Sequence, residues 1–172
     1  SGSYIQEEDG TVRFATSEDD QDMVFGGFVH FMYDKGDTLT WNLKSDAAAS
    51  NVTLFARLGA EYAKPDQVTG EKHYSFTDDE FQVKVNGVAI KYGKISMHNV
   101  PDTGGFLTFQ DYYMAANLDL KEGDNTIEMV VNNDINLFST IAAAAPCIDA
   151  IKLLSTSNLT WPEAKLSNFE RD

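Results

Sequence analysis

Aromatic and amide side chains are the residues of this sequence best suited to bind a ligand. Aromatic rings stack on the flat C–H faces of sugars, and amides exchange hydrogen bonds with sugar hydroxyl groups. Asn132, Asn133 and Asn136 stand shortly before Phe138 and could supply such amides. The same rings could equally pack in a hydrophobic core. The candidate rings are Tyr62, Tyr74, Phe106, Phe109, Tyr112, Tyr113 and Phe138.

A carboxylate in an apolar stretch is the second candidate for chemistry. Asp149 lies in the apolar run 147–154, and strict alternation puts it on the same face as Ile151 and Leu153. A carboxylate there needs a cation, a cluster of hydrogen-bond donors or exposure at the end of the strand. A site built from oxygen ligands suits calcium, which takes about six to eight of them. The alternative is that Asp149 caps a turn.

The sequence contains no recognisable catalytic motif. Acidic residues adjoin at 7–8, 18–20 and 78–80, but neighbours on a strand point to opposite faces. Glycoside hydrolysis needs two carboxylates that face each other across a sugar, about 5 to 10 Å apart. The three histidines lie far apart, and no nucleophile elbow or phosphate loop occurs. We therefore expect no catalytic residues and no enzymatic activity.

Composition limits the partners of the chain. Its 172 residues fit one domain, and the formal net charge of −14 repels phosphate backbones and anionic lipids. No apolar run approaches the roughly 20 residues of a membrane span. The single cysteine, Cys147, excludes an internal disulfide and a cysteine-rich zinc site, and we expect it to be a small buried apolar residue. We expect no nucleic acid partner, no membrane insertion and a monomer.

Alternation of apolar and polar residues with a period of two dominates the chain and predicts strands throughout. The dipeptide Asn86-Gly87 predicts a type I′ hairpin turn, after which Val88, Ile90 and Tyr92 should continue a returning strand. Short strands separated by regularly spaced turns indicate about ten strands in two packed sheets, an all-β antiparallel sandwich. The clearest runs are 38–44, 52–58, 81–85, 127–131 and 147–154.

The strand pattern ends near residue 155. We predict one β-sandwich module over residues 1–155 and a C-terminal strap, or the start of a linker, over residues 156–172. Trp161 favours a strap that packs on the sandwich, because a large aromatic side chain on a free linker would lie in water. The alanine-rich stretch 140–145 is expected to form a loop or a single turn instead of a regular helix.

The order of motifs resembles the carbohydrate-binding modules of families six and thirty-five, which are calcium-containing β-sandwiches attached to glycoside hydrolases. The resemblance extends over residues 4–154 and implies a jelly-roll fold of the galactose-binding-like type. The residues that carry it are the opening strand 4–9, the glycine-rich turn and "GD" strand at 26–29 and 34–41, the hairpin 85–87, the "TGGF" stretch 101–109, and the closing segments 118–127 and 148–151.

The resemblance also implies a structural calcium ion. Its ligands would be Gln6, Glu8 and Asp149, together with backbone carbonyls of the glycine-rich turn. Gln6 stands where the family usually has an acidic residue, so the site would carry less negative charge.

A sugar-binding site on the loops is the third implication. Phe106 or Phe109, at the family's tryptophan positions, would be the stacking platform. Residues 133–146 are a long insertion that could rebuild or cover this site. The full set of expected ligand-binding residues is Phe106, Phe109, Tyr112, Tyr62, Asn133, Asn136 and Phe138.

The function implied is non-catalytic binding of a polysaccharide by a module of a larger secreted or surface-attached bacterial protein. Binding would hold an attached glycoside hydrolase near its substrate. The acidic net charge favours a neutral plant glycan, such as mannan, xylan or galactan, over an anionic one. The alternative is a structural or protein-binding module, which packs on a catalytic domain or acts as an adhesin. An exposed apolar loop at 134–146 would favour that alternative.

Overall fold

A computed structural model of the chain describes residues 4–6, 12–14, 29, 32, 34–60, 64–65, 72–98, 109–134 and 145–161. These residues form strands, turns and bends, and none of them is helical. No helix long and apolar enough to cross a membrane occurs in these ranges. The expected loop at 140–145 lies outside them, except for its last residue.

The strands follow one another along the whole described chain. They are β1 (Tyr4–Gln6), β2 (Val12–Phe14), β3 (Thr38–Ser45), β4 (Ala49–Gly59), β5 (Lys64–Pro65), β6 (Lys72–Thr77), β7 (Phe81–Val85), β8 (Val88–Ala89), β9 (Lys94–His98), β10 (Gln110–Leu120), β11 (Gly123–Val131), β12 (Cys147–Leu154) and β13 (Leu159–Thr160).

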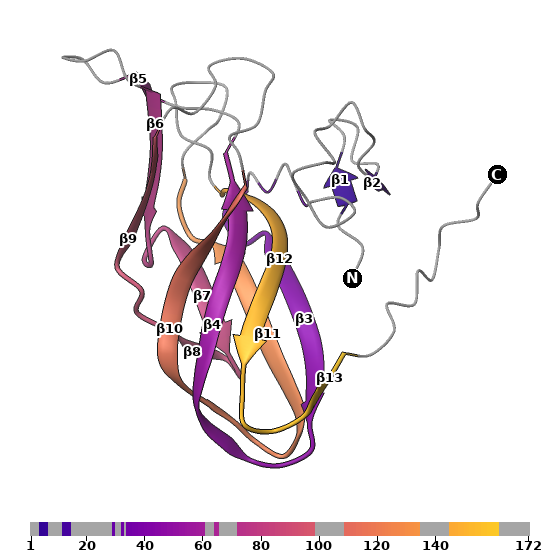
Figure 1. Ribbon diagram of the computed structural model, residues 1–172. Helices are drawn as coiled ribbons and strands as arrows, with labels where there is room; N and C mark the ends of the chain where they lie inside the picture. Colours follow the sequence, from indigo (N-terminus) through magenta and orange to yellow (C-terminus); the bar gives the residue numbers. More distant parts are fainter. Residues whose placement is uncertain are drawn as a thin grey trace.

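Two sheets form the body of the molecule (Figure 1). One has the order β13-β3-β11-β7-β8, and the other has the order β10-β4-β12. A further sheet, β5-β6-β9, and the pair β1-β2 complete the described strands. Every pairing is antiparallel. The predicted all-β antiparallel sandwich is therefore confirmed.

The core lies between the two large sheets, and β4 contributes its centre. Every second residue of β4 from Val52 to Leu58 is completely buried. Residues of β7 and β11 on the facing sheet meet them and are also buried. Burial of each large apolar side chain stabilises the fold by about 1.5–3 kcal/mol. The fully buried residues of these three strands are Val52, Leu54, Ala56, Leu58, Phe81, Val83, Ile127 and Met129.

The Asn86-Gly87 hairpin turn is confirmed, but the strand that follows it is shorter than predicted. Asn86 has φ 50° and Gly87 has φ 80°, the two positive values of a type I′ turn. The returning strand β8 ends at Ala89, so the prediction that it continues through Ile90 and Tyr92 is wrong. Beyond it, the backbone nitrogen of Ile90 still donates to the carbonyl of Val83 at 2.9 Å, and the phenol of Tyr92 donates to the carbonyl of Phe81 and lies 3.3 Å from that of Thr77.

The segment after β12 lies along the edge of the larger sheet. β13 pairs with the end of β3, and the side chain of Asn158 is hydrogen-bonded to Asp46 at 2.6 Å. The hydroxyl groups of Ser45 and Ser157 are 2.7 Å apart. Trp161, the last residue described, is 41% exposed. The division of the chain at residue 155 stays a prediction.

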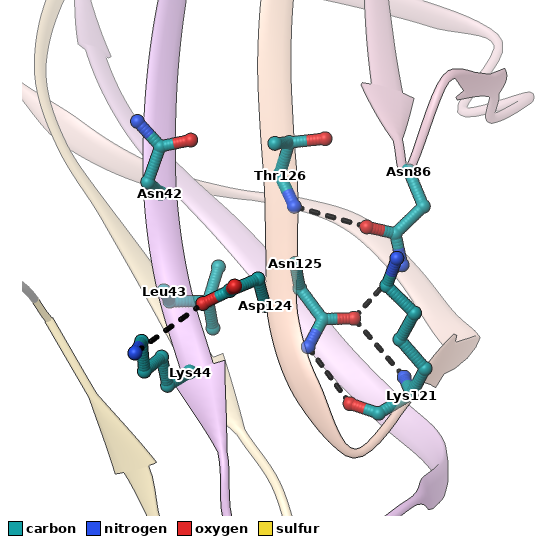
Figure 2. Close-up of a pocket in the computed structure, with 8 residues that line it drawn as sticks. All are labelled: Asn42, Leu43, Lys44, Asn86, Lys121, Asp124, Asn125 and Thr126. Atoms are coloured by element: carbon teal, nitrogen blue, oxygen red, sulfur yellow. Dashed lines mark hydrogen bonds and ion pairs between the residues drawn. The ribbon is translucent and has the colours of Figure 1, made fainter.

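Two asparagines connect the turns at one end of the sandwich (Figure 2). The amide of Asn86 accepts a hydrogen bond from the backbone nitrogen of Thr126 at 2.9 Å and donates one to Oδ1 of Asn125 at 2.8 Å. Asn125 is buried, and its amide nitrogen donates to the carbonyls of Lys121 and Gly123. The hairpin turn is thereby tied to the turn that precedes β11.

Replacement of Asn86 by glycine should isolate the contribution of this amide. Glycine accepts the positive φ of the turn, so Asn86→Gly removes the side-chain hydrogen bonds without strain in the turn, at a small added cost in backbone entropy. We expect the free energy of unfolding in urea to fall by about 2 kcal/mol, at about 1 kcal/mol for each bond. The exposed Asn42 on β3 provides the control, because Asn42→Ala should change stability by less than about 0.5 kcal/mol. Equal, small losses in both variants would contradict the proposed tie between the turns.

Candidate functional site

The predicted loop site lies largely outside the described residues. Tyr62, Phe106, Asn136 and Phe138 all belong to segments whose structure is not described. The expected position of a sugar-binding site on these loops therefore stays a prediction.

The described members of the predicted set make contacts within the fold. Phe109 is only 2% exposed, which leaves little of its ring for a ligand. Tyr112 lies opposite Ala56 on β4 and packs against the core, and burial raises the pKa of its phenol. The amide nitrogen of Asn133 donates to the carbonyl of Glu80 at 3.1 Å. None of these contacts excludes a ligand role, but each gives the residue a structural one.

A pocket of about 480 Å³ lies at the end of the sandwich where Asn86 and Asn125 meet (Figure 2). It is lined by Asn42, Leu43, Lys44, Asn86, Lys121, Asp124, Asn125 and Thr126. Its two central amides are hydrogen-bonded to backbone groups of the turns, and its Lys44 and Asp124 form an exposed ion pair of 3.7 Å. The hydrogen bonds and the ion pair within the fold therefore explain why these polar side chains line the pocket.

Of the three predicted calcium ligands, the structure describes the side chain of Asp149 alone. Gln6 lies on β1, where its backbone pairs with Val12, and Glu8 lies outside the described residues. In the part of the chain that is described, no three acidic, histidine or cysteine side chains come together in a group that could hold a metal ion.

Asp149 occupies a β-bulge. Ile148 pairs with Leu58 and Ala150 pairs with Arg57, so Asp149 is an extra residue between two consecutive pairings. Because of the bulge, Asp149 and Ala150 both lie opposite Arg57. Strict alternation predicts instead that Asp149 shares a face with Ile151. The side chain of Asp149 is completely buried, and its Oδ2 lies 3.0 Å from Nε of Arg57.

This ion pair gives Asp149 one of the environments that the sequence allows for it, a neighbouring cation. The described cation beside the carboxylate is the guanidinium of Arg57. A buried carboxylate with an arginine in contact does not need a metal to compensate its charge. The role of Asp149 as a calcium ligand, together with Gln6 and Glu8, stays a prediction.

The ion pair continues across the outer face of the smaller sheet, the side turned away from β11. Arg57 Nη1 is 3.5 Å from Oδ1 of Asp111, and Lys152 Nζ is 2.5 Å from Oδ2 of the same residue. Lys152, followed by Arg57, lowers the pKa of the Asp111 carboxyl group. Asp111 is therefore an anion at neutral pH, held between two cations.

An aromatic pair lies beside these charges on the same face. Tyr113 pairs with Phe55 across β10 and β4, and the ring centroids are 5.9 Å apart at an interplanar angle of 72°. Tyr113 is 58% exposed, whereas its neighbour Tyr112 points to the core. Tyr113 is one of the candidate aromatic rings of the sequence, but the predicted ligand-binding set contains its neighbour Tyr112 instead. Only the register of β10 against β4, where Tyr113 faces Phe55 and Tyr112 faces Ala56, distinguishes the two.

Removal of the Asp149 carboxylate should destabilise the protein equally with and without calcium. Asp149→Asn removes one of the two carboxylates beside the half-buried guanidinium of Arg57, which keeps its contact with Asp111. We therefore expect a loss of stability below the about 3–5 kcal/mol that a fully broken buried pair costs. We expect the same fall in melting temperature in calcium and in chelator, because the lost contact is to arginine. Asp124→Asn, at an exposed ion pair, is the control and should have almost no effect. A loss that appears only in calcium would contradict the arginine contact and support the role of Asp149 as a metal ligand.

No protein-family model matches the sequence, and no curated protein matches it significantly. Solved structures do match. A family 35 carbohydrate-binding module from an environmental isolate superposes with a TM-score of 0.50 and 20% identity, over 81% of this chain and 80% of that one. The family 35 module of Cellvibrio japonicus Abf62 gives 0.46 and 18%, over 80% and 78%.

An exo-β-1,3-galactanase from Phanerochaete chrysosporium also matches, with a TM-score of 0.46 and 18% identity, over 90% of this chain and 29% of that one. Family 35 modules are non-catalytic, in keeping with a sequence that contains no recognisable catalytic motif. At this level of identity the likeness concerns the fold. The chain has the β-sandwich fold of the family 35 carbohydrate-binding modules.

Proposed function

We propose that this chain binds a polysaccharide without altering it chemically. The observation that carries the proposal is the match of four-fifths of the chain to a family 35 carbohydrate-binding module. Because that likeness concerns the fold, the argument to function is one of analogy. It is supported by the ordered motifs at 101–109, 118–127 and 148–151.

The ligand that we propose is a neutral plant glycan, such as mannan, xylan or galactan. The net charge of −14 creates a negative potential around the chain, which opposes the approach of a uronate-rich polymer. A neutral polymer is not affected by this potential.

The biological role that we propose is to hold an attached glycoside hydrolase at its substrate, outside the cell or on its surface. A binding module linked to a catalytic domain raises the effective substrate concentration without any contact to the reacting bond. Such a role needs no metal or acid–base chemistry in the module itself.

Affinity electrophoresis of the intact chain tests the proposal. Native gels would contain soluble mannan, xylan, galactan, β-glucan or pectin, and a gel without polysaccharide gives the reference mobility. We expect retardation in at least one of the neutral gels and none in pectin, because bound protein migrates with the immobile polymer. Bovine serum albumin, as an acidic protein without a sugar site, controls for changes in gel viscosity.

Unchanged mobility in every gel would contradict the proposal. It would favour the alternative of a module that packs on a catalytic domain or another protein. Strong retardation in pectin alone would contradict the preference for a neutral ligand.

A further inference from the structure

The outer face of β10–β4–β12 combines the two kinds of side chain that sugar binding requires. The strands present an exposed aromatic ring, Tyr113, next to a charged pair, Asp111 and Lys152. Figure 1 shows this sheet as one layer of the sandwich, with β3, β7 and β11 behind it and no described strand over its other side. We propose that this face is the glycan-contacting surface, with Tyr113 as the stacking platform for one uncharged sugar ring and Asp111 and Lys152 as its hydrogen-bonding partners.

This inference rests on the proposed function and names the surface and residues that would perform it. It differs from the sequence-based expectation, which places the site on the loops that carry Phe106.

Tyr113 is held in position by the sheet. Its backbone pairs with Phe55 in the middle strand, and the edge-to-face contact between the two rings restricts its movement. More than half of its surface nevertheless remains in contact with solvent. A tyrosine already restricted in this way loses little conformational entropy when a sugar stacks on it.

Of the polar partners, Lys152 lies in the row of Tyr113, on the other side of Phe55, and Asp111 lies one row along the same face. Asp111 stands two residues before Tyr113, a separation of about 6.8 Å along a strand, so a ring stacked on Tyr113 brings its hydroxyl groups near the carboxylate. The side chains of Asp111 and Lys152 are 35% and 45% exposed. Their mutual ion pair and the contact of Asp111 with Arg57 fix both groups before a ligand arrives. A carboxylate that accepts and an ammonium group that donates can together engage two hydroxyl groups of one sugar.

The charges on this face favour an uncharged ligand. Arg57 and Lys152 balance Asp111 and Asp149, and Asp119, exposed on β10 between the buried Leu118 and Leu120, leaves the face with one negative charge in excess. The carboxylate of a uronate would have to compete with Asp111 for Lys152. A neutral ring can bind to the pair without breaking it.

Variants of the intact chain test the surface, in the polysaccharide gel that retards the wild type most strongly. Tyr113→Thr removes the ring but keeps a residue that suits a strand, and we expect affinity to fall at least about tenfold, which corresponds to about 1.4 kcal/mol. Tyr113→Phe retains the ring and should bind within about threefold of the wild type. Lys152→Met should weaken binding several-fold. Each mobility is compared with that of the same variant in a gel without polysaccharide, because Lys152→Met alters the net charge.

Two further variants serve as controls for position. Trp161→Ala removes an exposed aromatic residue next to β13, on the other sheet, and should leave binding unchanged. Phe106→Ala removes the expected loop platform and should also leave binding unchanged if the face is the site. Thermal unfolding of each variant verifies that it remains folded.

The outcomes separate this inference from the proposed function. If the wild type binds and Tyr113→Thr binds equally well, the face is not the site, although the function stands. Loss of binding in Phe106→Ala alone would place the site on the loops and overturn the inference. If the wild type binds no polysaccharide, both the function and the assigned surface are wrong.

Discussion

The pleat of β4 is the constraint on which the rest of the described structure depends. Alternate residues of this strand point to opposite sides of the smaller sheet. Leu54, Ala56 and Leu58 point inward and are completely buried, whereas Phe55 and Arg57 point outward. β4 is also the middle strand, paired on both edges, so its register fixes the residues of β10 and β12 that share each face. The core and the proposed glycan-contacting surface are thus two sides of one strand.

The bulge at Asp149 shows how a local irregularity changes the chemistry of that outer face. One extra residue in β12 brings a buried carboxylate next to Arg57, which in turn contacts Asp111. A buried ion pair adds little net stability, because desolvation of both charges offsets their attraction. Arg57 has one carboxylate on each side, and its contact with Asp111 lies beside the contact of Asp111 with Lys152.

Sequence reasoning succeeded where alternation is undisturbed. The runs in β4, β7 and β11 predicted the buried residues correctly, and Asn86-Gly87 predicted the hairpin turn. It failed for β8, which ends at Ala89, while the phenol of Tyr92 bonds to the carbonyl of Phe81 across the hairpin. Such a bond has no local signature in the sequence.

The candidate site was harder to predict, because it depends on register. Tyr112 and Tyr113 are adjacent, and no pattern in β10 tells which one faces outward, since the strand contains several register shifts. Strict alternation likewise placed Asp149 on the face of Ile151, because a single inserted residue is invisible without its partner strand. The pairing of Arg57 with Asp149 joins residues that are 92 positions apart, and no motif connects them.

The most direct test of the account is to map the contact surface by NMR, with a soluble oligosaccharide of the polymer that binds. Amide chemical shifts of the assigned ¹⁵N-labelled chain would be followed as the ligand is added. The account predicts that the largest changes occur at 53–57, 111–114 and 150–154, on the three strands of the smaller sheet. Changes confined to the loop 101–108, or to the turns around Asn86 and Asn125, would contradict it.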